Sequence, residues 1–247
     1  MEKGTLLFLH AYPLDGHLWD PQVESLAPGF RALAPSLPGF GGRPPGPDTL
    51  DGWVDEVLAM LDREGVGSFI PVGLSMGGYL AFRIVERVPW RIAGLVLCNT
   101  RASPDAPEVR ERRLDLVRKA REEGIGWLAD QSVPLLLSEE TRKMRPTVES
   151  YVREATGRAD PEGVDRALLA MRDRPDSRPL LPTIQVPVLC IAGAADALTP
   201  PSEMQEMATQ IPRATLVTLA GAGHLSNREA TEAFNQALRE YLAALPG

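Results

Sequence analysis

The chain has 247 residues, of which 44% are hydrophobic, and a formal net charge of −7. This length fits one large domain, or a core with an inserted lobe, and the apolar share allows a sizeable buried core. The acidic balance argues against nucleic acid and against anionic membrane surfaces as partners.

The first hundred residues alternate short apolar runs with helix-like stretches. Strands are expected at 5–12, 30–37, 68–73 and 91–99, and helices at 17–28, 50–63 and 79–88. Such β-α-β-α alternation predicts a parallel sheet covered by helices. Pro71 is awkward in the third run, because proline removes one donor from the hydrogen-bond ladder.

The pattern changes between Arg101 and Thr183, where charges are dense and no strand pattern occurs. Helices are expected there at 107–123, 125–137, 139–157 and 161–173. The α/β pattern then resumes, with strands at 186–196 and 214–224, a helix between them and a last helix near 229–243. The sequence therefore predicts an α/β core at 1–100 and 184–247, interrupted by a helical lobe at 101–183.

The two cysteines, Cys98 and Cys190, each lie inside an apolar strand-like run, so we expect both to be reduced and buried. No metal-type spacing of ligands occurs, and we expect neither a metal nor a cofactor. The first residues do not read as a signal peptide, and no apolar run reaches 18 residues. A soluble, cytoplasmic protein is the expectation.

The stretch GLSMGG, at 73–78, fits the pattern G-x-S-x-G around Ser75. A serine stands exposed at the end of a central strand only if the chain turns sharply there. That turn strains the serine backbone and brings Gly73 and Gly77 together, which residues without a Cβ tolerate. The following helix aims free N–H groups at the serine oxygen. The pattern predicts a nucleophile; the alternative is a strand-to-helix turn with an incidental serine.

A serine hydroxyl needs a base to remove its proton, and the chain has three histidines. His224 follows a strand-like run in a loop of small residues, whereas His10 ends the first strand and His17 lies in a polar turn. Asp196 follows the preceding strand, where a carboxylate can orient an imidazole; the alternative is a turn or capping role. We expect Ser75, Asp196 and His224 to form a catalytic triad.

The chain resembles the α/β-hydrolase family over nearly its whole length, on the motifs HAYPLDGHLW, LPGFGGRPPGP, GLSMGGYLAF, LVLCNTRASPD, GAADALTPP and GAGHLSN. It is most similar to small esterases, perhydrolase-type enzymes and 3-oxoadipate enol-lactonase-like proteins. The resemblance implies an eight-stranded, mostly parallel sheet with a helical cap inserted after the sixth strand, at 101–183. A serine nucleophile implies acyl transfer from an ester, thioester, lactone or amide.

The resemblance also implies an oxyanion hole made by the backbone N–H groups of Tyr12 and Met76. The family usually has glycine where this chain has Ala11, and alanine disfavours a positive φ. His10 is then a structural residue of the loop. Some family members carry their acid at the position of Asn99, which cannot ionise here, so Asp196 has no evident rival.

The sequence predicts the substrate less specifically than it predicts the catalytic residues. Four apolar residues are candidates for the substrate pocket, with ordinary core packing as the alternative for each: Trp19, Phe40, Trp127 and Leu198. The arginines of the lobe either include one that binds a substrate carboxylate, as an enol-lactone requires, or form a solvated helix face. We expect a small-molecule acyl substrate and hydrolysis of a carboxylic ester or lactone. Acyl transfer to peroxide and a non-catalytic ligand-binding fold are the alternatives.

Overall fold

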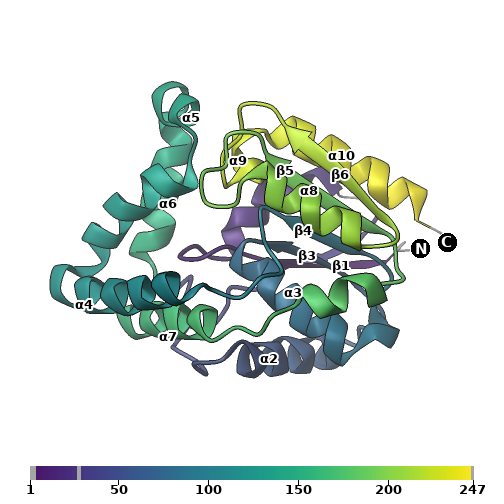
Figure 1. Cartoon of the computed structure of the whole chain (residues 1–247), viewed down its shortest axis with the longest axis horizontal. Coiled ribbons are helices and arrows are strands. Elements are labelled where there is room, and N and C mark those ends of the chain that lie inside the picture. Colours follow the sequence, from purple (N-terminus) through teal and green to yellow (C-terminus); the bar gives the residue numbers. More distant parts are fainter. Residues whose placement is uncertain (1–3, 27–28, 246–247) are drawn as a thin grey trace.

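The computed structural model describes residues 4–26 and 29–245, and in that part of the chain six strands form one sheet (Figure 1). The strand order is β2-β1-β3-β4-β5-β6. The strands are β1 (Thr5–Leu9), β2 (Arg31–Leu33), β3 (Ile70–Leu74), β4 (Leu95–Cys98), β5 (Val188–Gly193) and β6 (Ala214–Leu219). Each overlaps one of the six apolar runs, so the predicted α/β architecture is confirmed.

The expected number of eight strands is wrong for the described residues, because the sheet has six and all of its pairs are parallel. The segments between these six are helices, or loops such as 38–47 that are rich in glycine and proline. Proline lacks the N–H that a sheet ladder needs, which disfavours a strand in such a loop. Pro71 itself lies within β3, paired with Leu7 of β1.

Helices cover both faces of the sheet, and alternate strand side chains pack against them. Leu7 and Leu9 join an apolar cluster with α2 (Leu50–Arg63), α3 (Met76–Arg87) and α8 (Pro201–Gln210). Leu6 and Phe8 join a second cluster on the other face, with α1 (Asp20–Leu26) and α10 (Thr231–Ala244). Both cysteines are buried and unpaired, as expected.

The remaining helical segments differ from expectation mainly at their ends. The helix expected at 17–28 is a 3-10 turn, η1 (Gly16–Trp19), that runs into α1, and residues 27–28 lie outside the described part. The last helix is preceded by a separate turn, α9 (Ser226–Glu229). Two further 3-10 turns are η2 (Pro89–Arg91) and η3 (Arg178–Thr183). None of the helices in the described part combines the length and the apolar character that crossing a membrane requires.

Four helices lie between β4 and β5, and Figure 1 shows them gathered on one side of the sheet: α4 (Pro107–Leu136), α5 (Glu139–Met144), α6 (Pro146–Gly157) and α7 (Pro161–Arg172). α4 breaks at Gly124, where φ is 85°, so it is the two helices that the sequence predicts there. The single helix expected at 139–157 is wrong. It divides before Pro146, because proline lacks an N–H and disfavours helical angles at the preceding residue.

Close contacts join this helical segment to loops of the core. Arg158 makes an ion pair of 2.7 Å with Asp15, whose side chain is fully buried. The N–H of Asp160 donates to the carbonyl of Gly39 at 2.8 Å. Gly39 and Gly163 touch so closely that a Cβ on either would collide with the other backbone. The absence of side chains at these two glycines therefore permits the approach of α7 to the core.

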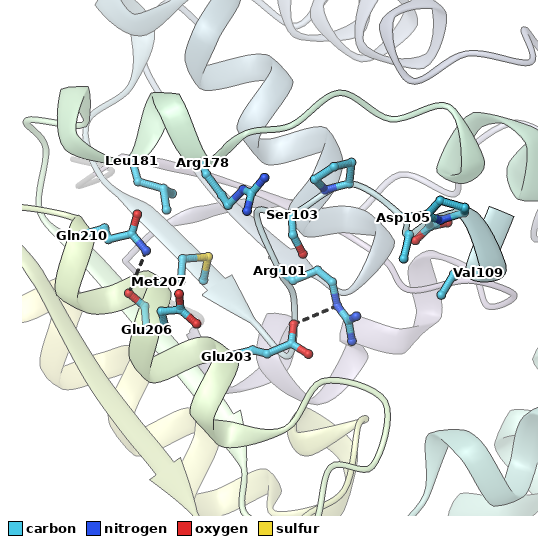
Figure 2. A pocket seen from close by; sticks show the side chains of 13 residues that line it. Arg101, Ser103, Asp105, Val109, Arg178, Leu181, Glu203, Glu206, Met207 and Gln210 are labelled. Carbon is cyan, nitrogen blue, oxygen red and sulfur yellow. Dashed lines mark hydrogen bonds and ion pairs between the residues drawn. The ribbon is translucent and has the colours of Figure 1, made fainter.

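A cavity of about 570 Å³ lies where the helical segment joins the core, beside α8 (Figure 2). Arg101 on the outgoing linker and Arg178 on η3 line it. Both arginines already have acidic partners, because Arg101 lies 3.2 Å from Glu203 and Arg178 lies 2.6 Å from Asp176. The cavity contains none of the predicted triad residues.

Candidate active site

All strands run parallel, so their carboxyl ends lie at one edge of the sheet, and the strand order reverses between β1 and β3. Ligands of open α/β sheets bind beyond the carboxyl ends, at such a reversal. Ser75 follows β3, Asp196 comes three residues after β5, and His224 comes five residues after β6. The topology thus brings residues from distant parts of the sequence to the same edge.

Ser75 occupies the sharp turn between β3 and α3, with a φ of 54° and a ψ of −114°. The turn has no room for side chains around it: a Cβ on Gly73 would collide with the Gly77 carbonyl, and one on Gly77 with the Leu9 carbonyl. β4 and the loop after it hold the turn, since Thr100 Oγ1 donates to the Ser75 carbonyl at 2.8 Å. The strained elbow that the glycine pattern predicts is present.

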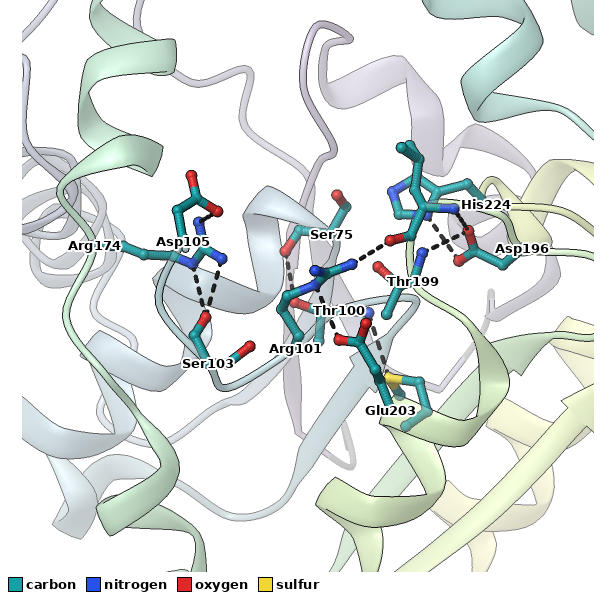
Figure 3. A network of polar contacts seen from close by, with 12 residues as sticks. Ser75, Thr100, Arg101, Ser103, Asp105, Arg174, Asp196, Thr199, Glu203 and His224 are labelled. Atoms are coloured by element: carbon teal, nitrogen blue, oxygen red, sulfur yellow. Dashed lines mark hydrogen bonds and ion pairs between the residues drawn. The ribbon is translucent and has the colours of Figure 1, made fainter. Parts of the chain in front are cut away.

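His224 and Asp196 are hydrogen-bonded, with 2.8 Å between Nδ1 and Oδ2, and both side chains are almost completely buried (Figure 3). The other carboxylate oxygen, Oδ1, accepts from the N–H groups of Leu198 and Thr199, each at 2.9 Å. Asn99 Nδ2 donates to Oδ2 at 2.8 Å. Four donors therefore converge on one carboxylate.

These donors determine the charge on Asp196 and the tautomer of His224. Burial alone would raise the pKa of Asp196, but His224 and the hydrogen bonds from Thr199 and Asn99 outweigh it and hold that pKa below its ordinary value. An ionised carboxylate only accepts hydrogen bonds, so the imidazole places its proton on Nδ1. Nε2 then carries the lone pair that a general base needs.

Ser75 and His224 line one pocket of about 400 Å³ beneath the helical segment. No hydrogen bond joins their side chains within the described residues. The pocket walls are mostly apolar, with Leu116, Leu128 and Leu168 among the lining residues. A small molecule that enters this pocket meets the serine and the histidine together.

The two residues predicted for an oxyanion hole are Met76, which follows Ser75 in the chain, and Tyr12, which lines the same pocket as Ser75. Met76 is the first residue of α3, where backbone N–H groups have no partner inside the helix, and Tyr12 lies in the loop after β1. Neither N–H has a hydrogen-bond partner within the residues the structure describes. The two residues predicted for an oxyanion hole are thus both placed at the carboxyl edge of the sheet with free donors.

The other two histidines have different surroundings. His10 is fully buried; its Nε2 accepts from the Leu37 N–H at 2.9 Å, and its Nδ1 lies 3.0 Å from the Ala11 carbonyl. Burial lowers the pKa of His10 to about 4, so it stays neutral near pH 7. His17 is exposed and contacts Asp20 at 3.2 Å. His10 therefore has the structural position expected for it.

Of the four predicted pocket residues, only Leu198 lines the pocket with Ser75. Trp19 packs on the opposite face of the sheet, with its ring centroid 5.0 Å from that of Phe8. Phe40 is buried against Trp53, at a centroid distance of 6.4 Å, and Trp127 packs into the same core cluster. The structure thus places Trp19, Phe40 and Trp127 in or against the core clusters and not among the residues that line this pocket.

A buried charged cluster that the sequence does not predict lies in the pocket wall. Asp105 binds both Arg113 and Arg174, the latter at 2.5 Å, and Arg174 lies over the ring of Tyr79. Burial would raise the pKa of Asp105, but the two guanidinium groups hold it below its ordinary value. The sequence carries no local signal for this cluster, because Asp105 and Arg174 are 69 positions apart. Arg113 is one of the lobe arginines for which the sequence leaves open a substrate carboxylate or a solvated helix face; the structure pairs it with Asp105.

Comparisons with known proteins agree with this geometry. The model of the alpha/beta hydrolase family matches residues 6–237. A thermophilic esterase from Thermogutta terrifontis, solved with malate bound, has a similar structure, with a TM-score of 0.95 and 40% identity over 99% of this chain and 91% of that one. A pimeloyl-acyl-carrier-protein methyl ester esterase from Aromatoleum aromaticum is 29% identical over 91% of this chain and 92% of its own. A 3-oxoadipate enol-lactonase from Acinetobacter baylyi is 26% identical over 96% and 88%. Since the family model spans nearly the whole chain, the protein belongs to the alpha/beta hydrolase family.

Proposed function

We propose that the protein hydrolyses a small carboxylic ester or lactone through a covalent acyl-enzyme. The observation that carries the proposal is one pocket that contains both a strained serine, Ser75, and a histidine, His224, oriented by a buried carboxylate. The relatives point the same way, since two are named as esterases and one as an enol-lactonase.

In the first half of the reaction, Ser75 Oγ attacks the carbonyl carbon while His224 Nε2 takes the hydroxyl proton. The tetrahedral intermediate then breaks its bond to the leaving oxygen, which receives that proton from His224, and the acyl group remains on Ser75. Asp196 stabilises the imidazolium that forms between these two transfers. Catalytic hydrogen bonds commonly tighten only when substrate is bound, which accommodates the absence of a Ser75–His224 bond in the described residues.

In the second half, His224 removes a proton from water, whose oxygen attacks the acyl carbonyl. The bond between the acyl carbon and Ser75 Oγ then breaks, Oγ receives the proton from His224, and the carboxylic acid leaves. In both halves negative charge develops on the carbonyl oxygen. The N–H groups of Tyr12 and Met76 are assigned to that oxygen, and one such donor is typically worth about 3 kcal/mol in the transition state.

The charges around the pocket favour a substrate with a second, negatively charged group. Arg101, Arg112 and Arg113 line it, but Arg101 already pairs with Glu203 and Arg113 with Asp105. Arg112 makes no ion pair within the described residues. Two relatives support such a substrate, because malate and 3-oxoadipate are carboxylates. In this proposal residues 101–183 act as a cap, which supplies the arginines and covers the serine.

The decisive experiment is covalent labelling of Ser75 with an organophosphonate, followed by mass spectrometry. Ser75→Ala should abolish labelling and lower kcat by at least about three orders of magnitude while the fold stays intact. Near-normal turnover by Ser75→Ala would remove Ser75 from the mechanism. A panel of short p-nitrophenyl esters and lactones, with and without peroxide, distinguishes hydrolysis from perhydrolysis.

A further inference from the structure

Among the described residues outside the two loops that carry the acid and the base, Asn99 is the one whose side chain forms hydrogen bonds with both. It follows β4, is fully buried, and has a φ of 45°. That left-handed conformation is tolerated by asparagine and aspartate better than by most residues. Its place after β4 directs the side chain to the loops after β5 and β6 (Figure 3 shows Asp196 and His224 of these loops).

The contacts of Asn99 fix which way its amide points. Nδ2 donates to Asp196 Oδ2 at 2.8 Å and to the Gly223 carbonyl at 3.2 Å. A carboxylate and a carbonyl oxygen can only accept, so the NH₂ group must face them. Oδ1 then faces Ser226 Oγ, 2.5 Å away, two residues beyond His224.

The two oxygens of the Asp196 carboxylate have different donors. Leu198 and Thr199 donate to Oδ1 only, so apart from His224 the donor to Oδ2 is Asn99. Asn99 holds Oδ2, and Oδ2 is the oxygen that accepts from His224 Nδ1. The amide therefore restrains the oxygen that orients the base.

We propose that Asn99 is a positioning residue for the reaction. Its amide aligns Asp196 Oδ2 with His224 Nδ1 and favours the ionised carboxylate, because its NH₂ group donates to that form. This role rests on the proposed function of Ser75, Asp196 and His224. It requires a hydrogen-bond donor at position 99, so a side chain of the same shape that cannot donate should fail.

Asn99→Asp tests that requirement, because it keeps the size and the backbone preference and replaces the NH₂ group by oxygen. Two carboxyl groups in contact share one proton, which the pair releases only at raised pH. While the proton is held, the new carboxyl group can donate to Asp196 as the amide does. Once it is released, the two groups repel, and we expect kcat to fall about 10- to 100-fold below that of the wild type.

The expected signature is a decline of kcat with rising pH that the wild type lacks. Asn99→Ala, which has no titratable group, should show a loss of similar size that does not vary with pH. Asn227→Asp is the matched control: Asn227 is also buried beside the His224 loop, but it contacts Leu18 and Gln22 rather than Asp196. It should keep the pH profile of the wild type even if it lowers stability.

A second readout needs no substrate. The proton on His224 Nδ1 should give a downfield NMR resonance, which is assigned by its loss in Asp196→Asn. This resonance should move with pH in Asn99→Asp but not in Asn227→Asp. A wild-type pH profile and an unmoved resonance in Asn99→Asp, with Ser75 still labelled by phosphonate, would overturn the positioning role alone. A failure to label wild-type Ser75, with the resonance behaving as expected, would overturn the proposed function instead.

Discussion

Replacing Asp196 by asparagine tests how the carboxylate controls His224. The two oxygens of Asp196 accept four hydrogen bonds, whereas an amide has one accepting oxygen. If that oxygen faces the N–H groups of Leu198 and Thr199, the NH₂ group faces His224 Nδ1 and the amide of Asn99. His224 must then accept on Nδ1 and carry its proton on Nε2, where it cannot take the proton of Ser75.

The wrong tautomer should be costly for the rate. The corresponding substitution in a serine-protease triad lowers kcat about 10⁴-fold, or about 5 kcal/mol of transition-state stabilisation. The donor of Asn99 would also face another donor in a buried site, which should lower the free energy of unfolding by about 1–3 kcal/mol.

The assay is kcat for a p-nitrophenyl ester near pH 7, measured beside urea unfolding. Asp176→Asn is the control, since it also removes one negative charge but lies on the surface and pairs with Arg178. That variant should keep wild-type kcat. A folded Asp196→Asn enzyme within tenfold of the wild-type rate would show that the carboxylate does not set the tautomer of His224.

Three further predictions concern pH, the cap and charge selectivity. His10 has a pKa of about 4 in the folded protein and near 6.5 in the unfolded chain, so the unfolded chain binds more protons as the pH falls. In urea unfolding, this difference should make the protein about 2 kcal/mol less stable at pH 5 than at pH 8. His10→Gln should remove that pH dependence. Gly163→Ala places a methyl group against Gly39, so it should displace α7, lower the melting temperature and expose the pocket to faster proteolysis. Arg112→Gln should lower kcat/KM about 3- to 10-fold for an ester with a distal carboxylate and leave kcat/KM for neutral esters unchanged. Arg118→Gln, on the same helix but outside the pocket, should change kcat/KM for neither kind of ester.

The positions of Ser75, Asp196 and His224 were predictable because they depend on local signals and on one rule of topology. Glycines on either side of a serine report a turn without room for side chains, and the structure has that turn. Parallel strands bring their carboxyl ends to one edge, so residues after β3, β5 and β6 become neighbours wherever they lie in the chain. Neither inference needs the packing of the helices.

The pocket wall was not predictable in the same way, because it depends on which face of each element meets which neighbour. Trp19 comes soon after the loop that contains Tyr12, but η1 turns its side chain under the sheet, against Phe8 and Phe234. Asp105 lines the pocket and pairs with Arg174, which lies 69 positions later in the chain and folds back to it. Such pairings are fixed by tertiary packing, which the hydrophobic period of a single segment does not record.

The boundary between the helical segment, which we propose acts as a cap, and the sheet is also set by contacts rather than by chain order. The buried carboxylate of Glu229 accepts from the Ser138 N–H at 2.8 Å and from the Leu225 N–H at 3.1 Å. Leu225, which follows His224, also donates to the Leu136 carbonyl at 3.1 Å, at the end of α4. Moving this end of the cap alone would leave buried polar groups without partners, at about 1–3 kcal/mol each. Residues 136–138 should therefore move together with the His224 loop, although in sequence they lie well inside the predicted cap.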